Sequence, residues 1–327
     1  MVLVYPRVNA VWGPGAQDDP DFPDVWRRKA HWSFRPGGPD ATPETPYPGW
    51  ANISDVKFRN TASLGAIALV CASAGEGTWG RAGAHAGILD VNDVNRHPTH
   101  EQLIWDVDVG GNPHAIERIP DNGSVVVASS QDVVGVDGGG FLSLYAPRVL
   151  ADPSTLGRVA TIPFEKAHGV LWDPANKWLW AIGKNELRTY AVEGSLVRTR
   201  LRLVTSQPLY EADRPEPDVG HDLMADYLHQ HNLLMTATHG AYVFGAHPGS
   251  GGARWARLSG EKKLKSLTRH AGGEFIWVHG EPQSPTDLWP HTNPYVYFGK
   301  SLDTSPVKRG WDTARIYKAR LWTTAIR

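Results

Sequence analysis

The chain has 327 residues, with 33 Lys and Arg against 34 Asp and Glu, so its formal net charge is −1. This balance gives no excess charge of either sign to attract nucleic acid or an anionic membrane. Cys71 is the only cysteine, which excludes an intramolecular disulfide and a cysteine-based zinc knuckle. We therefore expect no nucleic-acid or membrane partner, and a small-molecule or oligosaccharide substrate remains open.

The first seven residues lack the basic start, apolar stretch and small-residue cleavage site of a signal peptide. No apolar run approaches the length of a membrane span. We expect a soluble monomer, either cytoplasmic or secreted with its signal peptide absent from this sequence.

Short β-branched or aromatic runs, separated by Gly, Pro, Asn and Asp, fill the chain from its beginning. Residues 2–5, 9–12 and 31–34 are the first predicted strands, and the Pro- and Gly-rich residues 36–48 predict a surface loop. The pattern is typical of an all-β protein.

Five stretches then repeat one unit, a strand, a polar turn and a more apolar strand, and a third strand follows in most of them. The stretches are residues 55–73, 114–130, 168–183, 221–239 and 265–279. The unit recurs every ~45–60 residues, which matches the four-stranded blade of a β-propeller. Residues 2–34 and 315–322 would supply one more blade, closed by both ends of the chain. We predict a single β-propeller domain over residues 1–327, with six four-stranded blades and seven as the alternative.

The first strand of each blade of a propeller lines the central channel, and its start lies at the same mouth as the end of the second strand. This register places five side chains at equivalent positions around one axis: Asp55, His114, His168, His221 and Lys265. The ends of the second strands and the loops after them add Ser130, His239, His279, Trp79, Arg81, His85, Lys184 and Trp289 to the same face. In contrast, Trp178, Trp180 and Trp277 lie in apolar second strands and are predicted core residues.

Three histidines share this register, each beside small residues. Clustered neutral imidazoles waste donors and acceptors, and clustered protonated ones repel each other. A divalent cation (Mn, Ca, Zn or similar) held by His114, His168 and His221 resolves both problems. Acid–base histidines without a metal are the alternative.

Lys265 adds a positive charge beside these histidines. It can neutralise a substrate carboxylate or, with a lowered pKa, act as a base. The alternative is a structural ion pair with Asp55, Asp222 or Glu281. Asp55 can also orient a metal-bound histidine from behind.

The strand–turn–strand signatures that begin at His114, His168 and His221 resemble those of six-bladed propellers, including bacterial and fungal propeller proteins. The axial histidines are similar to those of propeller polysaccharide lyases of the oligogalacturonate lyase type, which hold a divalent metal. The resemblance implies β-elimination on a uronate-containing saccharide, with His114, His168 and His221 as metal ligands. It further implies that His239 or His279 removes the C5 proton, while Lys265 and Arg81 stabilise the carboxylate and the enolate-like intermediate.

The predicted substrate-binding residues are Asp55, Trp79, His85, Ser130, Lys184 and Trp289. Two other functions fit the same sequence. A metal-dependent hydrolase, either a lactonase or a glycosidase, would use the ring of polar groups to activate water. A non-catalytic sugar-binding propeller would use only the aromatic side chains at the mouth.

Overall fold

A computed structural model describes residues 1–5, 30–37, 47, 49–73, 84–91, 96–132, 138–209, 218–245, 255–281, 291–312 and 314–325. Within these ranges the regular structure is β-strand, apart from three single turns of 3-10 helix: η2 (His100–Gln102), η3 (Pro153–Thr155) and η4 (Leu196–Arg198). None of the described helices is long and apolar enough to cross a membrane.

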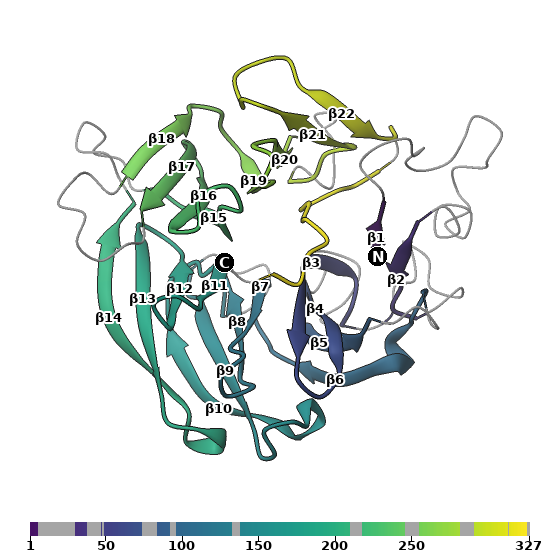
Figure 1. Cartoon of the computed structure of the whole chain (residues 1–327), viewed down its shortest axis with the longest axis vertical. Coiled ribbons are helices and arrows are strands. Elements are labelled where there is room, and N and C mark those ends of the chain that lie inside the picture. The colour runs from purple at the N-terminus through teal and green to yellow at the C-terminus, as the bar shows by residue number, and fades with distance from the viewer. Residues whose placement is uncertain are drawn as a thin grey trace. The chain divides into compact units, whose positions relative to one another are not determined.

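Five four-stranded sheets make up the fold, and the strands of each sheet follow one another in chain order (Figure 1). Sheet one contains β3 (Asn52–Thr61), β4 (Gly65–Ser73), β5 (His85–Asp90) and β6 (Leu103–Asp108). Sheet two contains β7 (Pro113–Arg118), β8 (Val125–Ser129), β9 (Phe141–Pro147) and β10 (Leu156–Pro163). Sheet three contains β11 (Gly169–Asp173), β12 (Trp178–Ile182), β13 (Glu186–Glu193) and β14 (Arg200–Pro208). Sheet four contains β15 (Gly220–Ala225), β16 (Asn232–Ala237), β17 (Gly240–Gly245) and β18 (Trp255–Ser259), and sheet five contains β19 (Leu264–Arg269), β20 (Phe275–His279), β21 (Tyr295–Gly299) and β22 (Val307–Gly310).

The repeated four-stranded antiparallel sheet confirms the predicted all-β propeller fold. The described residues form five four-stranded sheets, one fewer than the six predicted, together with one two-stranded sheet. The small sheet pairs β1 (Val2–Val4) with β2 (Trp32–Phe34).

The strand expected over residues 315–322 does not form, apart from a single bridge between Ile316 and Asn293. In this segment the Ala319 N–H donates to the side-chain hydroxyl of Ser266 in β19, 3.0 Å away, instead of to a backbone carbonyl as in a β-ladder. That both chain ends complete one blade stays a prediction.

The chain divides into two compact units. Unit 1 comprises Met1–Ala167, Val192–Arg202 and Trp322–Ala325, and it contains the two-stranded sheet and sheets one and two. Unit 2 comprises His168–Ala191 and Leu203–Leu321, and it contains sheets four and five and most of sheet three.

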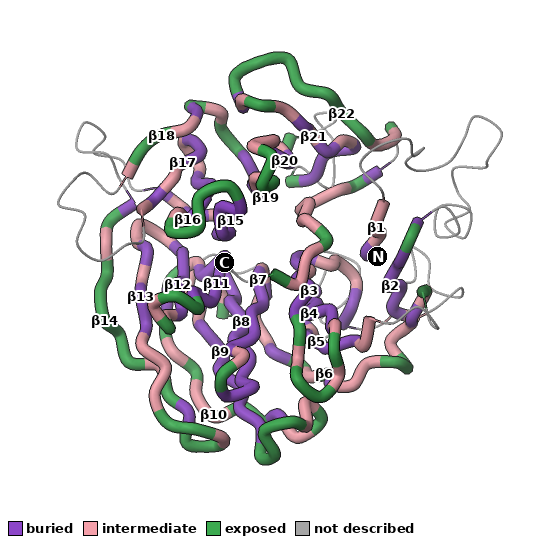
Figure 2. Tube along the Cα trace, viewed as in Figure 1, coloured by how far each residue is buried: buried purple, intermediate pink, exposed green. Residues whose placement is uncertain are grey.

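Burial decreases from the first strand of a sheet to the last, as β11 and β14 show in Figure 2. Apolar side chains between consecutive sheets of one unit form the core. In unit 2 one cluster joins sheets three and four around Trp180 and Phe244, and another joins sheets four and five around Trp277. Trp180 and Trp277 are confirmed as core residues, and Trp178 packs against the core while partly exposed. The buried Cys71 belongs to the corresponding core of unit 1.

Candidate functional site

Four of the five sheets carry a β-bulge at the same place, near the start of the first strand. The pairing register with the second strand shifts across Ser54, His114, His221 and Lys265. A bulge inserts one extra residue that has no cross-strand partner, bends the strand and redirects its side chain. Sheet three has no such shift, and there His168 directly precedes β11, with its N–H donating to the Ile182 carbonyl at 2.9 Å.

The bulge corrects the predicted register at one position. Ser54, and not Asp55, is equivalent to His114, His221 and Lys265, so Asp55 lies one residue beyond the predicted position. The equivalent of Asp55 in sheet four is Asp222, and both carboxylates are buried. Each accepts a backbone N–H from the first strand of the next sheet, Asp55 from Ile116 at 3.4 Å and Asp222 from Leu267 at 3.1 Å. These aspartates therefore connect neighbouring sheets.

Two of the predicted histidines lie together in unit 2. The rings of His168 and His221 meet edge to face, with their centroids 5.3 Å apart. Beside this pair, Gly169 allows β11 to pack closely against β15, because a Cβ there would lie 2.9 Å from the Cβ of Leu223. The Nδ1 atom of His221 is buried without a hydrogen-bond partner. Burial, followed by the positive charge of Lys265, holds the pKa of His221 well below its usual value, so this imidazole is neutral.

Lys265 is 7% exposed, and its ammonium group makes no hydrogen bond or ion pair with any residue that the structure describes. Burial, together with the nearby charges of Lys318 and Lys263, lowers its pKa to about 8. The ion pairs predicted with Asp55, Asp222 or Glu281 do not form. A buried cation without a partner is costly, which marks this position as one prepared for a ligand.

Asp222 pairs instead with two residues of the C-terminal segment. Arg320 binds both of its carboxylate oxygens, at 2.6 and 2.7 Å, and the Lys318 ammonium lies 3.4 Å from one of them. Despite complete burial, these cations hold the pKa of Asp222 at about 2. Asp222 is thus a shared partner of Lys318 and Arg320, and Lys265 adds a third positive charge that Asp222 does not pair with.

The predicted metal site is not assembled by the residues described. Among them, no group of three or more His, Cys, Asp or Glu side chains is arranged to hold a metal ion. His168 and His221 lie in unit 2, whereas His114 lies in unit 1. The positive charge of Lys265 and Lys318 beside His221 also opposes a divalent cation. The pair does not fit a metal by itself, and the three-histidine centre stays a prediction.

His239 has a carboxylate partner at the same end of sheet four. Its Nδ1 atom lies 3.3 Å from Oδ1 of Asp218, whose side chain is 4% exposed, while the histidine side chain is 31% exposed. The contact is an ion-pair distance without a hydrogen bond, since Asp218 Oδ1 has no hydrogen-bond partner among the described residues. A buried carboxylate at this distance favours the protonated form of an imidazole that accepts a proton from a substrate. His239 is thus the predicted base whose surroundings suit that role.

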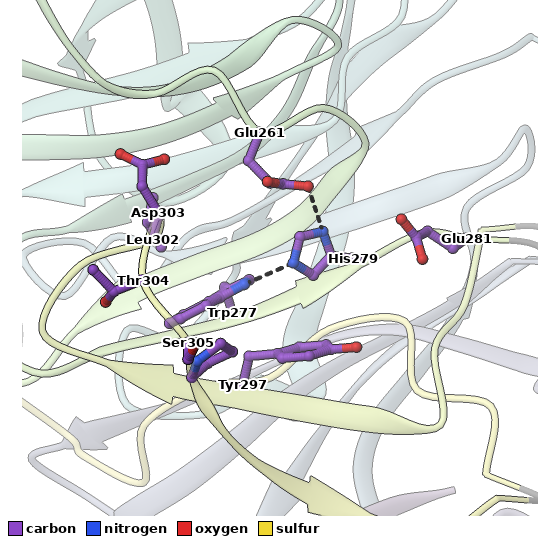
Figure 3. Close-up of a pocket in the computed structure, with 10 residues that line it drawn as sticks. Glu261, Trp277, His279, Glu281, Tyr297, Leu302, Asp303, Thr304 and Ser305 are labelled. Carbon is purple, nitrogen blue, oxygen red and sulfur yellow. Dashed lines mark hydrogen bonds and ion pairs between the residues drawn. The ribbon is translucent and has the colours of Figure 1, made fainter.

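His279 lies in a different environment, at the end of β20. It lines a cavity of about 410 Å³ in sheet five with Glu261, Glu281, Trp277 and Tyr297 (Figure 3). Burial lowers the pKa of His279, and the charges that act against this effect are those of Glu261 and Glu281. The pKa of Lys265 responds to lysines instead. The charges that act on the two predicted catalytic residues therefore differ, carboxylates at His279 and lysines at Lys265.

The remaining predicted residues are engaged locally or lie outside the described residues. In unit 1, His85 Nδ1 lies 2.7 Å from Asp106 Oδ1, and this hydrogen bond raises the pKa of His85. The hydroxyl of the buried Ser130 donates to the Asn112 carbonyl at 3.4 Å. Lys184, in unit 2, forms a backbone bridge with Val219 beside Asp218. Trp79, Arg81 and Trp289 lie outside the residues that the structure describes.

Sequence reasoning missed several side chains around these sites: Asp218, Glu261, Lys318 and Arg320. The strand predicted at the C-terminus would have paired Lys318 and Arg320 within a blade, and it gave no indication that both side chains share Asp222 as a partner. Asp218 was missed because the repeat predicted for this blade starts at His221, three residues later. It is the first described residue after residues 210–217.

Comparisons with known proteins support the fold. No family model matches the sequence, and no curated protein sequence matches it. The periplasmic gluconolactonase of Pseudomonas aeruginosa is similar in structure, with a TM-score of 0.50 and 13% identity, over 89% of this chain and 92% of that chain. A luciferin-regenerating enzyme has a TM-score of 0.48 and 14% identity, over 81% of each chain. At such identities the likeness concerns the fold and not the activity.

Proposed function

We propose that this propeller is an enzyme that acts on a small sugar-derived substrate with an anionic group, and that it hydrolyses a lactone or a related ester. The observation that carries the proposal is the Lys265 side chain, which is 7% exposed and whose ammonium makes no hydrogen bond or ion pair among the described residues. An anionic oxygen supplies the missing partner.

The chemistry divides between two groups of unit 2. Lys265, supported by Lys318, stabilises the negative charge that develops on the carbonyl oxygen as water attacks. His239, held by Asp218 at 3.3 Å, accepts the proton from that water. The neutral His221 offers its unpartnered Nδ1 atom to a substrate hydroxyl. As the C–O bond of the lactone breaks, the protonated His239 returns this proton to the leaving alkoxide oxygen. The product acid loses its own proton to solvent, and its carboxylate remains beside the cations until it leaves.

The gluconolactonase with a similar fold makes sugar lactones the first substrates to try, beginning with those that carry a carboxylate as the proposed anionic group. β-Elimination at a uronate, the reaction implied by the sequence, uses the same Lys265 to hold the carboxylate. Both reactions can be followed in one experiment, since lactone hydrolysis releases a proton and elimination creates an unsaturated uronate that absorbs ultraviolet light.

The experiment compares wild-type protein with Lys265→Met, His239→Gln and the control Lys262→Met on panels of sugar lactones and uronates. Lys262 is exposed and lies three positions before Lys265, so its replacement removes one charge outside the site. We expect proton release that falls roughly 10²–10³-fold in Lys265→Met, as when an oxyanion-stabilising donor is lost. Ultraviolet absorbance instead of proton release would favour the lyase, and full activity in folded Lys265→Met would refute the proposed site.

A further inference from the structure

We infer that the cavity around His279 is a second ligand site, which binds a hydroxylated organic cation of the size of an amino sugar. All of its lining residues belong to unit 2 and come from β20, β21 and three connecting segments: Glu261, Trp277, His279, Glu281, Tyr297 and Leu302–Pro306. Its volume of about 410 Å³ lies within the range of small-molecule pockets.

The charge of the lining selects for a cation. Glu261, Glu281 and Asp303 contribute three carboxylates, and no lysine or arginine lines the cavity. His279 does not offset this charge, because burial lowers its pKa and keeps it neutral near pH 7. An ammonium group therefore gains attraction here, whereas an anion is repelled.

Hydrogen bonds fix the orientation of His279 at the wall of the cavity. The indole N–H of Trp277 donates to Nε2 of His279 at 2.9 Å, as Figure 3 shows, so in the neutral ring the proton is assigned to Nδ1. This Nδ1 atom is buried, has no hydrogen-bond partner, and lies 3.5 Å from Glu261 Oε1. The buried Nδ1 side of the ring therefore faces Glu261, whose 42% exposed carboxylate a ligand ammonium can use.

Aromatic packing keeps this wall rigid. Tyr297 stacks on Trp277, with ring centroids 5.8 Å apart and an angle of 20° between the planes, and its ring meets His279 edge to face at 4.9 Å. The Tyr297 hydroxyl lies 3.4 Å from Asn293 Oδ1. Preorganised donors and acceptors reduce the entropy lost on binding, so a ligand that presents both an ammonium and hydroxyl groups fits best.

The second site is independent of the hydrolytic site proposed above. Leu264 pairs with His279 across β19 and β20, and the bulge that follows sets Lys265 apart from that ladder. The carboxylates that act on His279 do not appear among the groups that shift the pKa of Lys265. Loss of one site should leave the other able to bind.

The test is calorimetric titration with three sugars of one shape and different charge: glucosamine, glucose and glucuronate. We expect glucosamine to bind about tenfold more tightly than glucose, the gain typical of one charge-assisted hydrogen bond, and glucuronate to bind most weakly. Glu261→Gln and Glu281→Gln should each remove most of this preference. The control Glu101→Gln, an exposed carboxylate in unit 1, and Lys265→Met should both preserve it.

Selective ¹³C labelling of histidine locates the ligand. Glucosamine should shift the ring signals of His279, assigned by their loss in His279→Gln, and leave those of His221 unchanged. Equal affinity for glucosamine and glucose, no binding of any of the three sugars, or equal effects of Glu261→Gln and Glu101→Gln would each overturn the inference. Circular dichroism of every variant separates loss of binding from loss of fold.

Discussion

Lys265 passes directly over Gly280, so that a Cβ added to Gly280 would lie 2.7 Å from Lys265 Cε and 2.9 Å from its Cγ. The same Cβ would lie 3.0 Å from the backbone oxygen of His291. The absence of a side chain at Gly280 therefore sets the path of the lysine into the site.

Gly280→Ala should displace the Lys265 side chain and lower kcat/KM for the anionic substrate by about tenfold, with a loss of about 1–3 kcal/mol in the free energy of unfolding from overpacking. Gly157→Ala is the matched control, because a Cβ at Gly157 meets no atom within 4 Å. Steady-state kinetics and urea unfolding of both variants measure the effect. Equal kinetics in the two variants would mean that Gly280 does not position the lysine.

Lys265→Met should stabilise the protein near pH 7. The pKa of Lys265 is about 8 in the folded chain, against 10.5 for an ordinary lysine, so burying the charge costs about 3 kcal/mol while both the folded and unfolded states are protonated. Between pH 8 and 10.5 the unfolded state binds more protons, and the stability of the wild type rises with pH. Urea unfolding at pH 7 and pH 10 should therefore show the advantage of Lys265→Met shrinking. An equal difference in the free energy of unfolding at both pH values would mean that the pKa of Lys265 is not lowered by folding.

Binding of an anionic inhibitor should weaken as the pH rises through about 8, because the attraction requires the Lys265 ammonium. Competitive inhibition by an aldonate, measured across this range, gives the midpoint. In Lys265→Met the inhibition constant should be high and nearly independent of pH. A wild-type profile that is flat through pH 8 would assign anion binding to other residues.

Asp222→Asn should destabilise unit 2 by about 3–5 kcal/mol, since it leaves Lys318 and Arg320 without the buried carboxylate that they share. The pKa of Asp222 is about 2, below the usual 3.8, so the stability it provides is present above pH 3.8 and is lost as the pH falls through about 2. The exposed ion pairs of Glu193 with Arg200 and Arg202 supply the control, and Glu193→Gln should leave the urea midpoint unchanged.

The histidine metal centre predicted from the sequence can be tested by elemental analysis of purified protein. The lysines beside His221 lead us to expect no stoichiometric metal, and activity that survives dialysis against a chelator. One metal ion per chain, lost in both His114→Ala and His168→Ala, would restore the predicted three-histidine site.

The repeat made most of the fold predictable, because each blade can be recognised in the sequence as a strand, a polar turn and a more apolar strand. The same register brought His114, His221 and Lys265 to one position, and the structure places all three at the extra residue of a bulge. It failed at Asp55 because a bulge changes the count by one residue, and the side chains of adjacent strand residues point to opposite faces.

The partners of the site were harder to predict. Asp218 and Glu261 lie in connecting segments, where no periodic pattern indicates a neighbour. Arg320 binds Asp222, which lies 98 residues earlier in the sequence. Arg320 belongs to residues 315–322, whose alternating apolar residues predicted a strand. In that segment specific side-chain contacts, including the bond from Ala319 to Ser266, replace the ladder that local propensity favours.

The bulges have a consequence for how this scaffold accepts change. A residue without a cross-strand partner can be exchanged while every pair in the ladder is kept, and the chain already carries serine, histidine and lysine at this point of different sheets. Substitution of the bulge residue in one blade can therefore change ligand preference with little loss of stability. For a protein engineer, these few positions are the natural places to install a new specificity.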